Sequence, residues 1–290
     1  MIRGALCWFP TADGETLHGF LIEPAAVPGP RPALLLVHGV ALNFYTGPLP
    51  AIGQALAAEG YPALLINTRG HDWVSRAGAD LAGFGGATYE RLEDCLLDLD
   101  AAVRWLGEQG HGRVVLVGHS LGAVKALYYQ GERRHPAVVG VAALSCPRQY
   151  YTARAADQEG FTGTLERAEA LLAEGRGREL LWAPTTGSMG LWSAETFVSK
   201  YGRHERNDVR PHAARTGCPV LAVAGGAEHP YFPSYARELA AAAGAQGTVA
   251  VIDGADHRYT AHVPDVAAAL VQWLDRLPAN DGVRQARSPS

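Results

Sequence analysis

The stretch that most constrains the fold of this chain runs from Arg113 to Tyr129. Four apolar residues, Val114 to Val117, are typical of a buried strand, and Ala123 to Tyr129 is typical of the first turns of a helix. Between them lies Gly118-His119-Ser120-Leu121-Gly122, which fits the pattern G-x-S-x-G. A serine at such a sharp strand-to-helix turn has a strained backbone and an exposed hydroxyl. We therefore predict that Ser120 is a nucleophile rather than part of an ordinary tight turn.

Composition excludes several other classes of protein. The chain has 290 residues, of which 48% are hydrophobic, so it can bury a large core. The formal charge of −4, without a basic cluster, argues against a nucleic-acid partner and weakly against an anionic membrane surface. No apolar run is long enough for a transmembrane helix, and the first ten residues do not resemble a signal peptide. We therefore expect a cytoplasmic protein.

The cysteines give no sign of a metal site or a disulfide framework. They are far apart in the sequence and form no C-x-x-C pair. In a reducing compartment we expect them to be small buried hydrophobic residues, and we expect no metal ligated by them. The four residues are Cys7, Cys95, Cys146 and Cys218.

Apolar strands alternate with amphipathic helices along most of the chain. A hairpin is expected over residues 5–24 before this alternation begins. The pattern is typical of an α/β fold with a mostly parallel sheet, in which ligands bind at the carboxyl ends of the strands. The expected strands are 33–37, 62–66, 114–117, 137–144, 220–224 and 249–252, and the expected helices are 50–59, 89–106, 123–129, 233–243 and 264–277.

The alternation breaks between residues 148 and 217. This segment has helical patches at Thr164–Glu174 and Ala194–Tyr201 but no apolar run typical of a buried strand. We interpret it as a helical lid inserted into a core made of residues 1–147 and 218–278. Residues 279–290 have the composition of a disordered tail.

The inserted segment is rich in aromatic residues. Among them, Trp182, Trp192 and Phe197 are candidates for the wall of a substrate pocket. The alternative is that these rings only anchor the insertion to the core. We add His119 to the pocket candidates, although its side chain is expected to point away from that of Ser120 and to pack.

A serine hydroxyl needs a base to take its proton. His257 is the best candidate, because it follows the 249–252 strand in Gly254-Ala-Asp-His257 and precedes the final helix. His262 and His229 are the alternatives.

The base should in turn be held by a carboxylate from a neighbouring strand end. Glu228 is the first carboxylate after the 220–224 strand. Asp253 and Asp256 are too close in sequence to His257 for easy side-chain pairing. The resulting order is Ser120, Glu228, His257, which is the order found in α/β-hydrolases.

An ester carbonyl that is attacked by a hydroxyl develops negative charge on its oxygen, and two preorganised donors are needed there. The backbone N–H of Leu121, at the start of the helix after the serine, is one candidate. The other is the backbone N–H of Val40, which follows His38-Gly39 at the end of the 33–37 strand.

These motifs together resemble the α/β-hydrolase superfamily, and within it the serine esterases and lipases that carry a lid. The resemblance covers residues 15–277 and implies an eight-stranded sheet, a lid after the sixth strand and no cofactor. Two positions depart from the usual pattern: Glu228 stands where the family usually has Asp, and Asn67 opens a loop that usually begins with Asp. For Asn67 we expect a structural effect only. The matching residues are His38-Gly39, Arg69-Gly70-His71, Gly118-His119-Ser120-Leu121-Gly122, Glu228 and Gly254-Ala-Asp-His257.

The expected function is hydrolysis of a carboxylic ester or related small acyl compound through an acyl-enzyme on Ser120. Thioesterase, amidase or peptidase, lactonase, acyltransferase and lyase chemistry remain alternatives, because the same fold supports many reactions. A non-catalytic small-molecule binder is an alternative of another class. The sequence identifies neither the substrate nor the oligomeric state.

Overall fold

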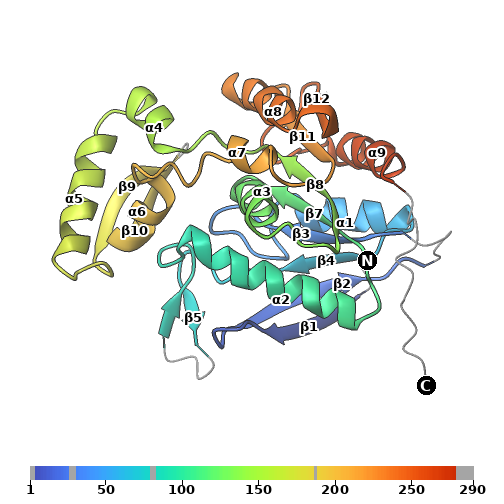
Figure 1. Ribbon diagram of the computed structural model, residues 1–290, viewed down its shortest axis with the longest axis horizontal. Coiled ribbons are helices and arrows are strands. Elements are labelled where there is room, and N and C mark those ends of the chain that lie inside the picture. Colours follow the sequence, from blue (N-terminus) through green and yellow to red (C-terminus); the bar gives the residue numbers. More distant parts are fainter. Residues whose placement is uncertain (1–3, 26–30, 79–82, 186–187, 279–290) are drawn as a thin grey trace.

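The computed structural model describes residues 4–25, 31–78, 83–185 and 188–278. Its centre is an eight-stranded sheet in which the first two pairs of neighbouring strands at one edge are antiparallel and the remaining five pairs are parallel (Figure 1). The expected α/β-hydrolase architecture is therefore confirmed. In spatial order the strands are β1 (Ala5–Pro10), β2 (Thr16–Ile22), β4 (Ala63–Ile66), β3 (Ala33–Val37), β7 (Val114–His119), β8 (Val138–Leu144), β11 (Val220–Gly225) and β12 (Gly247–Ile252).

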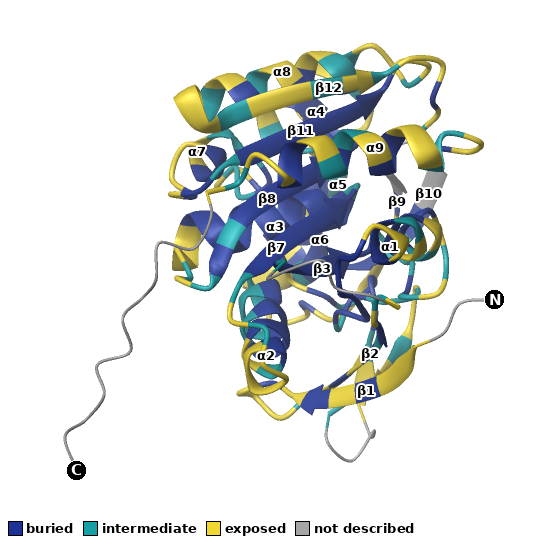
Figure 2. Cartoon of the chain, turned by 90° about the vertical axis from the view of Figure 1, so that its right-hand side faces the viewer, coloured by how far each residue is buried: buried dark blue, intermediate teal, exposed yellow. Residues whose placement is uncertain are grey.

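The central strands are buried on both faces, because helices cover the sheet from both sides. Along β3, Leu35 and Val37 face one apolar core, whereas Leu34 and Leu36 face the other. Figure 2 shows the central strands buried and the outer faces of the helices exposed. Helices α2 (Cys95–Glu108), α3 (Leu121–Arg133) and α8 (Tyr231–Ala242) pack against the first core, and α1 (Leu49–Ala58) and α9 (Val263–Leu274) pack against the second.

Two local expectations change in detail. The helix expected from residue 89 begins at Cys95, after the short 3₁₀ turn η1 (Leu92–Asp94). The glycine-rich loop before it contains a small antiparallel pair, β5 (Ser75–Ala77) and β6 (Gly83–Gly85). A second 3₁₀ turn, η2 (Gly244–Gln246), precedes β12.

Residues 148–217 follow β8, the sixth strand of the main sheet in chain order. The expectation of a purely helical segment is wrong, because an antiparallel hairpin lies in its middle. The sequence signal for this hairpin is short: Leu181 and Ala183 are buried, whereas Leu180 and Trp182 are exposed. The elements are α4 (Tyr151–Asp157), α5 (Phe161–Ala173), β9 (Leu180–Thr185), β10 (Ser188–Ser193), α6 (Ala194–Tyr201) and α7 (Arg210–Ala213).

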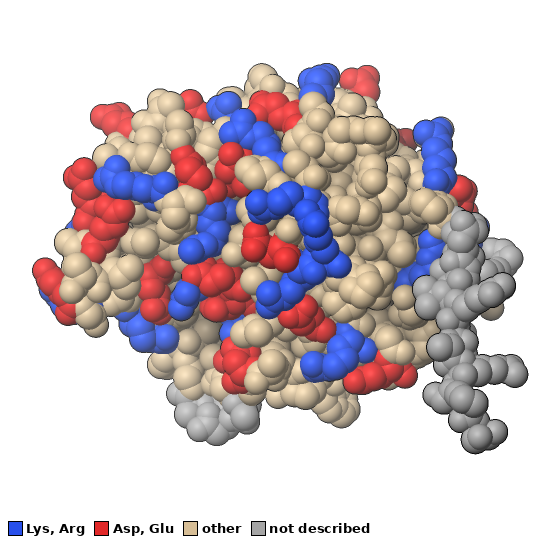
Figure 3. Space-filling model, viewed as in Figure 1, with Lys and Arg blue, Asp and Glu red and all other residues tan. Residues whose placement is uncertain are grey.

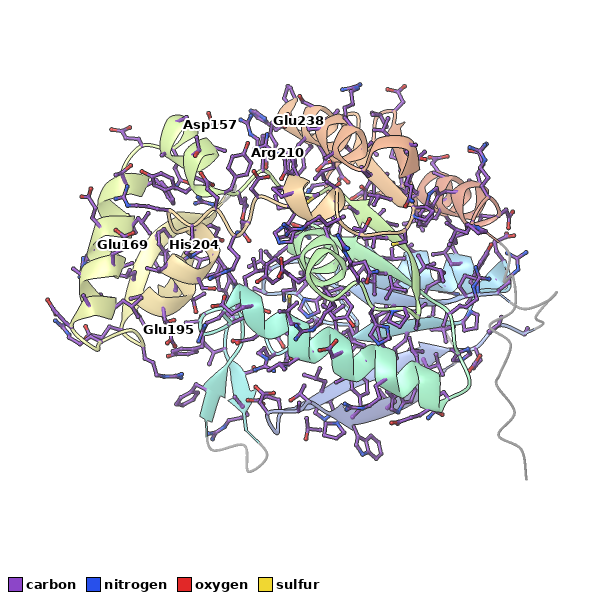
Figure 4. All side chains as sticks on the ribbon, in the orientation of Figure 1. Asp157, Glu169, Glu195, His204, Arg210 and Glu238 are labelled. Carbon is purple, nitrogen blue, oxygen red and sulfur yellow. The ribbon has the colours of Figure 1, made fainter. Side chains whose placement is uncertain are left out.

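The inserted segment has an apolar core of its own, which includes Phe161, Trp192 and Phe197. Acidic and basic side chains are interspersed over its outer surface (Figure 3). Where the chain returns to the core, Arg210 of α7 lies next to Glu238 of α8, with Nη1 3.1 Å from Oε2 (Figure 4). The segment is thus tied to the core by packing and by surface ion pairs.

Three further expectations concern composition. All four cysteines are buried, as expected, and each has a free thiol in this structure. Within the described ranges, no helix is both long and apolar enough to cross a bilayer. The expected disordered tail, 279–290, lies outside the described residues.

Candidate active site

Ser120 lies at the sharp turn between β7 and α3. Its φ is 54° and its ψ is −122°, so the strained conformation expected for this serine is present. Its backbone N–H donates to the carbonyl of Leu144 at 2.9 Å, which ties the turn to the end of β8. Ser120 is partly exposed and lines a cavity.

The flanking glycines are required because the backbones on either side of the turn approach closely. A Cβ on Gly118 would lie 2.1 Å from the carbonyl oxygen of Gly122. A Cβ on Gly122 would lie 2.0 Å from the carbonyl oxygen of Val37. Neither gap admits a methyl group, so the G-x-S-x-G pattern follows from the packing of α3 against β3 and β7.

His257 lies on the loop after β12 and is held by Glu228, which lies on the loop after β11. The His257 Nδ1 atom is 2.6 Å from Glu228 Oε1. The Glu228 side chain is 1% exposed, whereas that of His257 is 40% exposed. A carboxylate only accepts hydrogen bonds, so Nδ1 carries a proton, and the neutral form of the ring has its lone pair on Nε2. His257 is therefore set up to accept a proton at Nε2.

The second oxygen of Glu228 is also fully engaged. Oε2 accepts the Gly225 N–H at 2.6 Å and the Ser145 hydroxyl at 2.7 Å, and Tyr259 OH lies 2.7 Å from Ser145 Oγ. The hydrogen bonds from Gly225 and Ser145 fix the orientation of the carboxylate. Sequence reasoning missed Ser145 and Tyr259. The sequence did contain a signal for Ser145, because this residue directly follows β8 at the same edge of the sheet as the other site residues.

His119 packs beside His257, with ring centroids 5.0 Å apart. Its Nε2 lies 2.7 Å from the carbonyl oxygen of His257, so Nε2–H is the donor in this pair. Burial, followed by the nearby His257, lowers the pKa of His119 to about 3. His119 is thus neutral at physiological pH and supports the backbone of His257.

The loop after β3 approaches Ser120 closely. A Cβ on Gly39 would lie 3.1 Å from the Ser120 Cβ. The Gly39 carbonyl oxygen lies 2.8 Å from Nδ1 of buried His38. Val40 follows on the cavity wall, and Leu121 is the first residue of α3, where a backbone N–H has no earlier helical carbonyl as partner.

A cavity of about 480 Å³ lies over Ser120 and His257. Of the four pocket candidates, it is lined by His119 and Trp192 but not by the other two: Trp182 is 66% exposed on β9, and Phe197 is buried in the inserted segment's own core. Sequence reasoning missed Trp73 and Phe232. The lining residues are Gly39, Val40, Ala41, Leu42, Trp73, His119, Ser120, Pro147, Gln149, Trp192, Tyr201, Phe232, His257 and Arg258.

The other histidines considered as bases lie outside this lining. His262 Nδ1 pairs with Asp265 Oδ2 at 2.9 Å, and the His229 ring lies beside that of Tyr231, with centroids 5.0 Å apart and the planes tilted by 46°. In the described part of the chain, no cluster of three or more His, Cys, Asp or Glu side chains could hold a metal ion.

Comparisons with known proteins agree with this architecture. The structure of the alpha/beta hydrolase GrgF from Penicillium sp. sh18 is similar with a TM-score of 0.70 at 16% identity, covering 95% of this chain and 99% of that one. Est1E from Butyrivibrio proteoclasticus with bound ferulic acid gives a TM-score of 0.66 at 18% identity, covering 93% and 99%. A monoacylglycerol lipase from Paleococcus ferrophilus gives 0.64 at 18% identity, covering 94% and 98%.

At these identities the solved structures establish the fold alone. The family assignment comes from the sequence profile of the alpha/beta hydrolase family, which matches residues 34–272. That match spans the sheet from β3 onward and includes Ser120, Glu228 and His257. The chain therefore belongs to the alpha/beta hydrolase family.

Proposed function

We propose that this hydrolase cleaves carboxylic esters through an acyl-enzyme on Ser120. The observation that carries the proposal is that Ser120 and His257 line one cavity while buried Glu228 holds His257 Nδ1 at 2.6 Å. A strained serine, a histidine with a free Nε2 and a buried carboxylate are the parts of a nucleophile that is activated by a base.

In the proposed reaction, Ser120 Oγ attacks the ester carbonyl carbon while its proton passes to His257 Nε2. The tetrahedral intermediate collapses, the carbon–oxygen bond to the alcohol breaks, and the alcohol leaves with the proton from Nε2. A water molecule then gives a proton to Nε2 and attacks the acyl carbon. The second tetrahedral intermediate collapses, the bond between the acyl carbon and Ser120 Oγ breaks, and Oγ takes the proton back from Nε2, which releases the acid. Glu228 stays ionised and stabilises the imidazolium that forms in each half-reaction.

The N–H groups of Val40 and Leu121 are the proposed oxyanion donors. Two features support the Val40 N–H as a donor: Val40 lines the cavity, and the preceding Gly39 lies against Ser120. Leu121 is supported by its position at the start of α3, where the helix dipole also favours negative charge. Such donors each contribute roughly a hundredfold or more to the rate.

The proposed substrates are esters with an apolar or aromatic acyl group. The cavity of about 480 Å³ is walled by Trp73, Trp192 and Phe232, and its volume lies in the range of small-molecule sites. The likeness to Est1E, whose structure holds ferulic acid, supports an aromatic acid. Trp192 and Tyr201 belong to residues 148–217, so we propose that this segment acts as the lid.

A fluorophosphonate probe and a series of p-nitrophenyl esters test the proposal. We expect covalent labelling at Ser120, a burst of p-nitrophenol followed by steady turnover, and loss of both in Ser120→Ala with unchanged thermal unfolding. A folded protein that binds aromatic acids but neither labels nor turns over would contradict the proposal and would indicate a binding protein.

A further inference from the structure

Three charged side chains meet in the interior, away from the reacting atoms. Glu90 lies between Lys125 of α3 and Lys200 of α6, with one carboxylate oxygen facing each ammonium group. The Lys200 Nζ atom is 2.8 Å from Glu90 Oε2. The exposed fractions of the Glu90, Lys125 and Lys200 side chains are 0%, 1% and 0%. The mechanism proposed above uses none of these groups.

Electrostatics keeps this cluster together. Burial raises the pKa of Glu90, but the two lysines outweigh it and lower that pKa to about 2. Burial likewise lowers the pKa of Lys200, whereas Glu90 opposes that shift. Removing Glu90 would leave two buried cations without a counter-charge, so the three groups depend on one another. A Cβ on Gly70 would lie 2.1 Å from the Glu90 carboxyl carbon, which explains the glycine of Arg69-Gly70-His71.

A directed series of hydrogen bonds leads from this cluster to the loop beside Ser120. Lys125 Nζ donates to Thr68 Oγ1 at 2.8 Å. Thr68 Oγ1 lies 3.2 Å from His38 Nε2, and the Thr68 backbone N–H donates to the same nitrogen at 3.2 Å. His38 Nδ1 then lies 2.8 Å from the carbonyl oxygen of Gly39. Because Lys125 has only protons to offer, each hydroxyl and ring nitrogen in the series has a defined donor or acceptor role.

This series requires a neutral His38. Burial, followed by the charge of Lys125, lowers the pKa of His38 to about 3. At neutral pH its Nε2 can therefore accept from Thr68 while Nδ1–H donates to Gly39. The ring thus holds the Gly39 carbonyl on the buried side of the loop.

The planarity of the peptide group relates that carbonyl to the proposed oxyanion donor. In a trans peptide the C=O and the following N–H point in opposite directions, and no cis peptide occurs among the described residues. A Gly39 carbonyl directed toward His38 therefore directs the Val40 N–H the other way. Val40 lines the cavity that contains Ser120, so this orientation is the one that an oxyanion donor needs.

The other end of the cluster reaches the inserted segment. The Lys200 Nζ atom lies 5.2 Å from the ring centroid of Trp192, and Tyr201 is the next residue of α6. Both Trp192 and Tyr201 line the cavity. Glu90 therefore connects one wall of the cavity, through Lys200, with the loop beside Ser120, through Lys125.

We propose that Lys125 is a positioning residue: the buried Lys125–Glu90–Lys200 cluster holds His38 through Thr68 and so orients the Val40 N–H toward the oxyanion. This inference rests on the proposed function and assigns a different role to each of the two lysines. Lys125 acts on the reacting carbonyl through the loop, whereas Lys200 acts on the cavity wall through α6.

Lys125→Met and Lys200→Met form a matched pair of variants that tests these two roles. Each replaces one lysine by an uncharged side chain of similar length and leaves Glu90 paired with the other lysine, so the buried cluster carries one negative and one positive charge in both variants. With an aromatic acyl ester, we expect Lys125→Met to lower kcat by roughly tenfold to a hundredfold with little change in KM, since a donor is displaced rather than deleted. We expect Lys200→Met to raise KM several-fold while most of kcat remains.

Thr68→Val and Thr68→Ser identify the route from Lys125 to the loop. Thr68→Val should reproduce the kcat loss of Lys125→Met, the double variant should lose no more than either single one, and Thr68→Ser should retain activity. Unfolding temperatures show that the compared variants are folded. If both lysine variants changed kcat and KM to the same extent, or if the losses of kcat added up in the double variant of Lys125 and Thr68, the positioning role would be overturned. The proposed function would still stand as long as turnover depends on Ser120. Wild-type turnover that persists in Ser120→Ala would overturn both.

Discussion

His257 Nδ1 and Glu228 Oε1 are 2.6 Å apart, although the two residues lie on loops after different strands. Glu228 is the more rigid partner, because its other oxygen accepts hydrogen bonds from Gly225 and Ser145. Its extra methylene group relative to Asp is thus accommodated by donors already present at the strand ends. The departure from the usual family acid is compatible with a firmly held histidine.

We therefore predict that Glu228→Gln lowers kcat by about three to four orders of magnitude, as loss of the charge leaves the histidine tautomer unspecified. The amide would also bring its NH₂ group toward existing donors if its oxygen faced His257. Steady-state hydrolysis of a p-nitrophenyl ester measures the effect. Glu238→Gln is the control, since that carboxylate lies on the surface of α8 and pairs with Arg210. Equal activity in the two variants would contradict a role for Glu228.

The sequence predicted the parts of the site that depend on local pattern. The fully apolar run before Gly118 predicts a buried strand, and G-x-S-x-G predicts the strained turn, because both follow from the backbone geometry of a few consecutive residues. The order of Ser120, Glu228 and His257 follows from parallel strands ending at one edge of the sheet.

Other features depend on contacts between distant segments, and local pattern did not reveal them. Glu90, Lys125 and Lys200 are charged, so composition alone assigns them to the surface. Only the meeting of three segments makes their burial possible. The hairpin that includes Trp182 was missed for a related reason, since its strands pack on the inserted segment rather than on the main sheet and are not continuous apolar runs.

His119 provides a prediction about stability. Its pKa is about 3 in the folded protein, against 6.5 for an unperturbed histidine, so below about pH 6.5 the unfolded chain binds a proton that the folded chain does not. This difference lowers the free energy of unfolding as the pH falls. His119→Gln keeps a donor for the His257 carbonyl and removes the titration. Between pH 7 and pH 5 the wild type should lose about 2 kcal/mol more than the variant in urea unfolding. Parallel pH profiles would show that folded His119 takes up its proton near the usual pH.

Gly122 provides a prediction about folding. A Cβ there would lie 2.0 Å from the Val37 carbonyl oxygen, so Gly122→Ala must push α3 away from β3. We expect a large loss of stability, on the order of several kcal/mol, and poor soluble yield. Gly107→Ala is the matched control, because Gly107 lies in α2 with no atom within 4 Å of its Cβ position. It should be neutral or stabilising by up to about 1 kcal/mol. Similar unfolding temperatures for both variants would contradict the close approach.

Trp73 and Trp182 allow a test of which aromatic side chains contact the acyl group. Trp73 lines the cavity and contacts Trp192 edge to face at 5.5 Å, whereas Trp182 is 66% exposed on β9 and does not line it. Trp73→Ala should raise KM for an aromatic acyl ester by roughly tenfold, because stacking contributes about 1 kcal/mol beyond the buried area. Its effect on an acetyl ester, which is too small to reach the ring, should be minor.

Trp182→Ala should leave KM unchanged for both esters, since the ring that it removes faces solvent. Michaelis curves for the two esters with the two variants give four values of KM. If Trp182→Ala raised KM for the aromatic ester as much as Trp73→Ala, the hairpin rather than the wall at Trp73 would contact the acyl group. The substrate would then extend from Ser120 past the cavity to the outer face of the inserted segment.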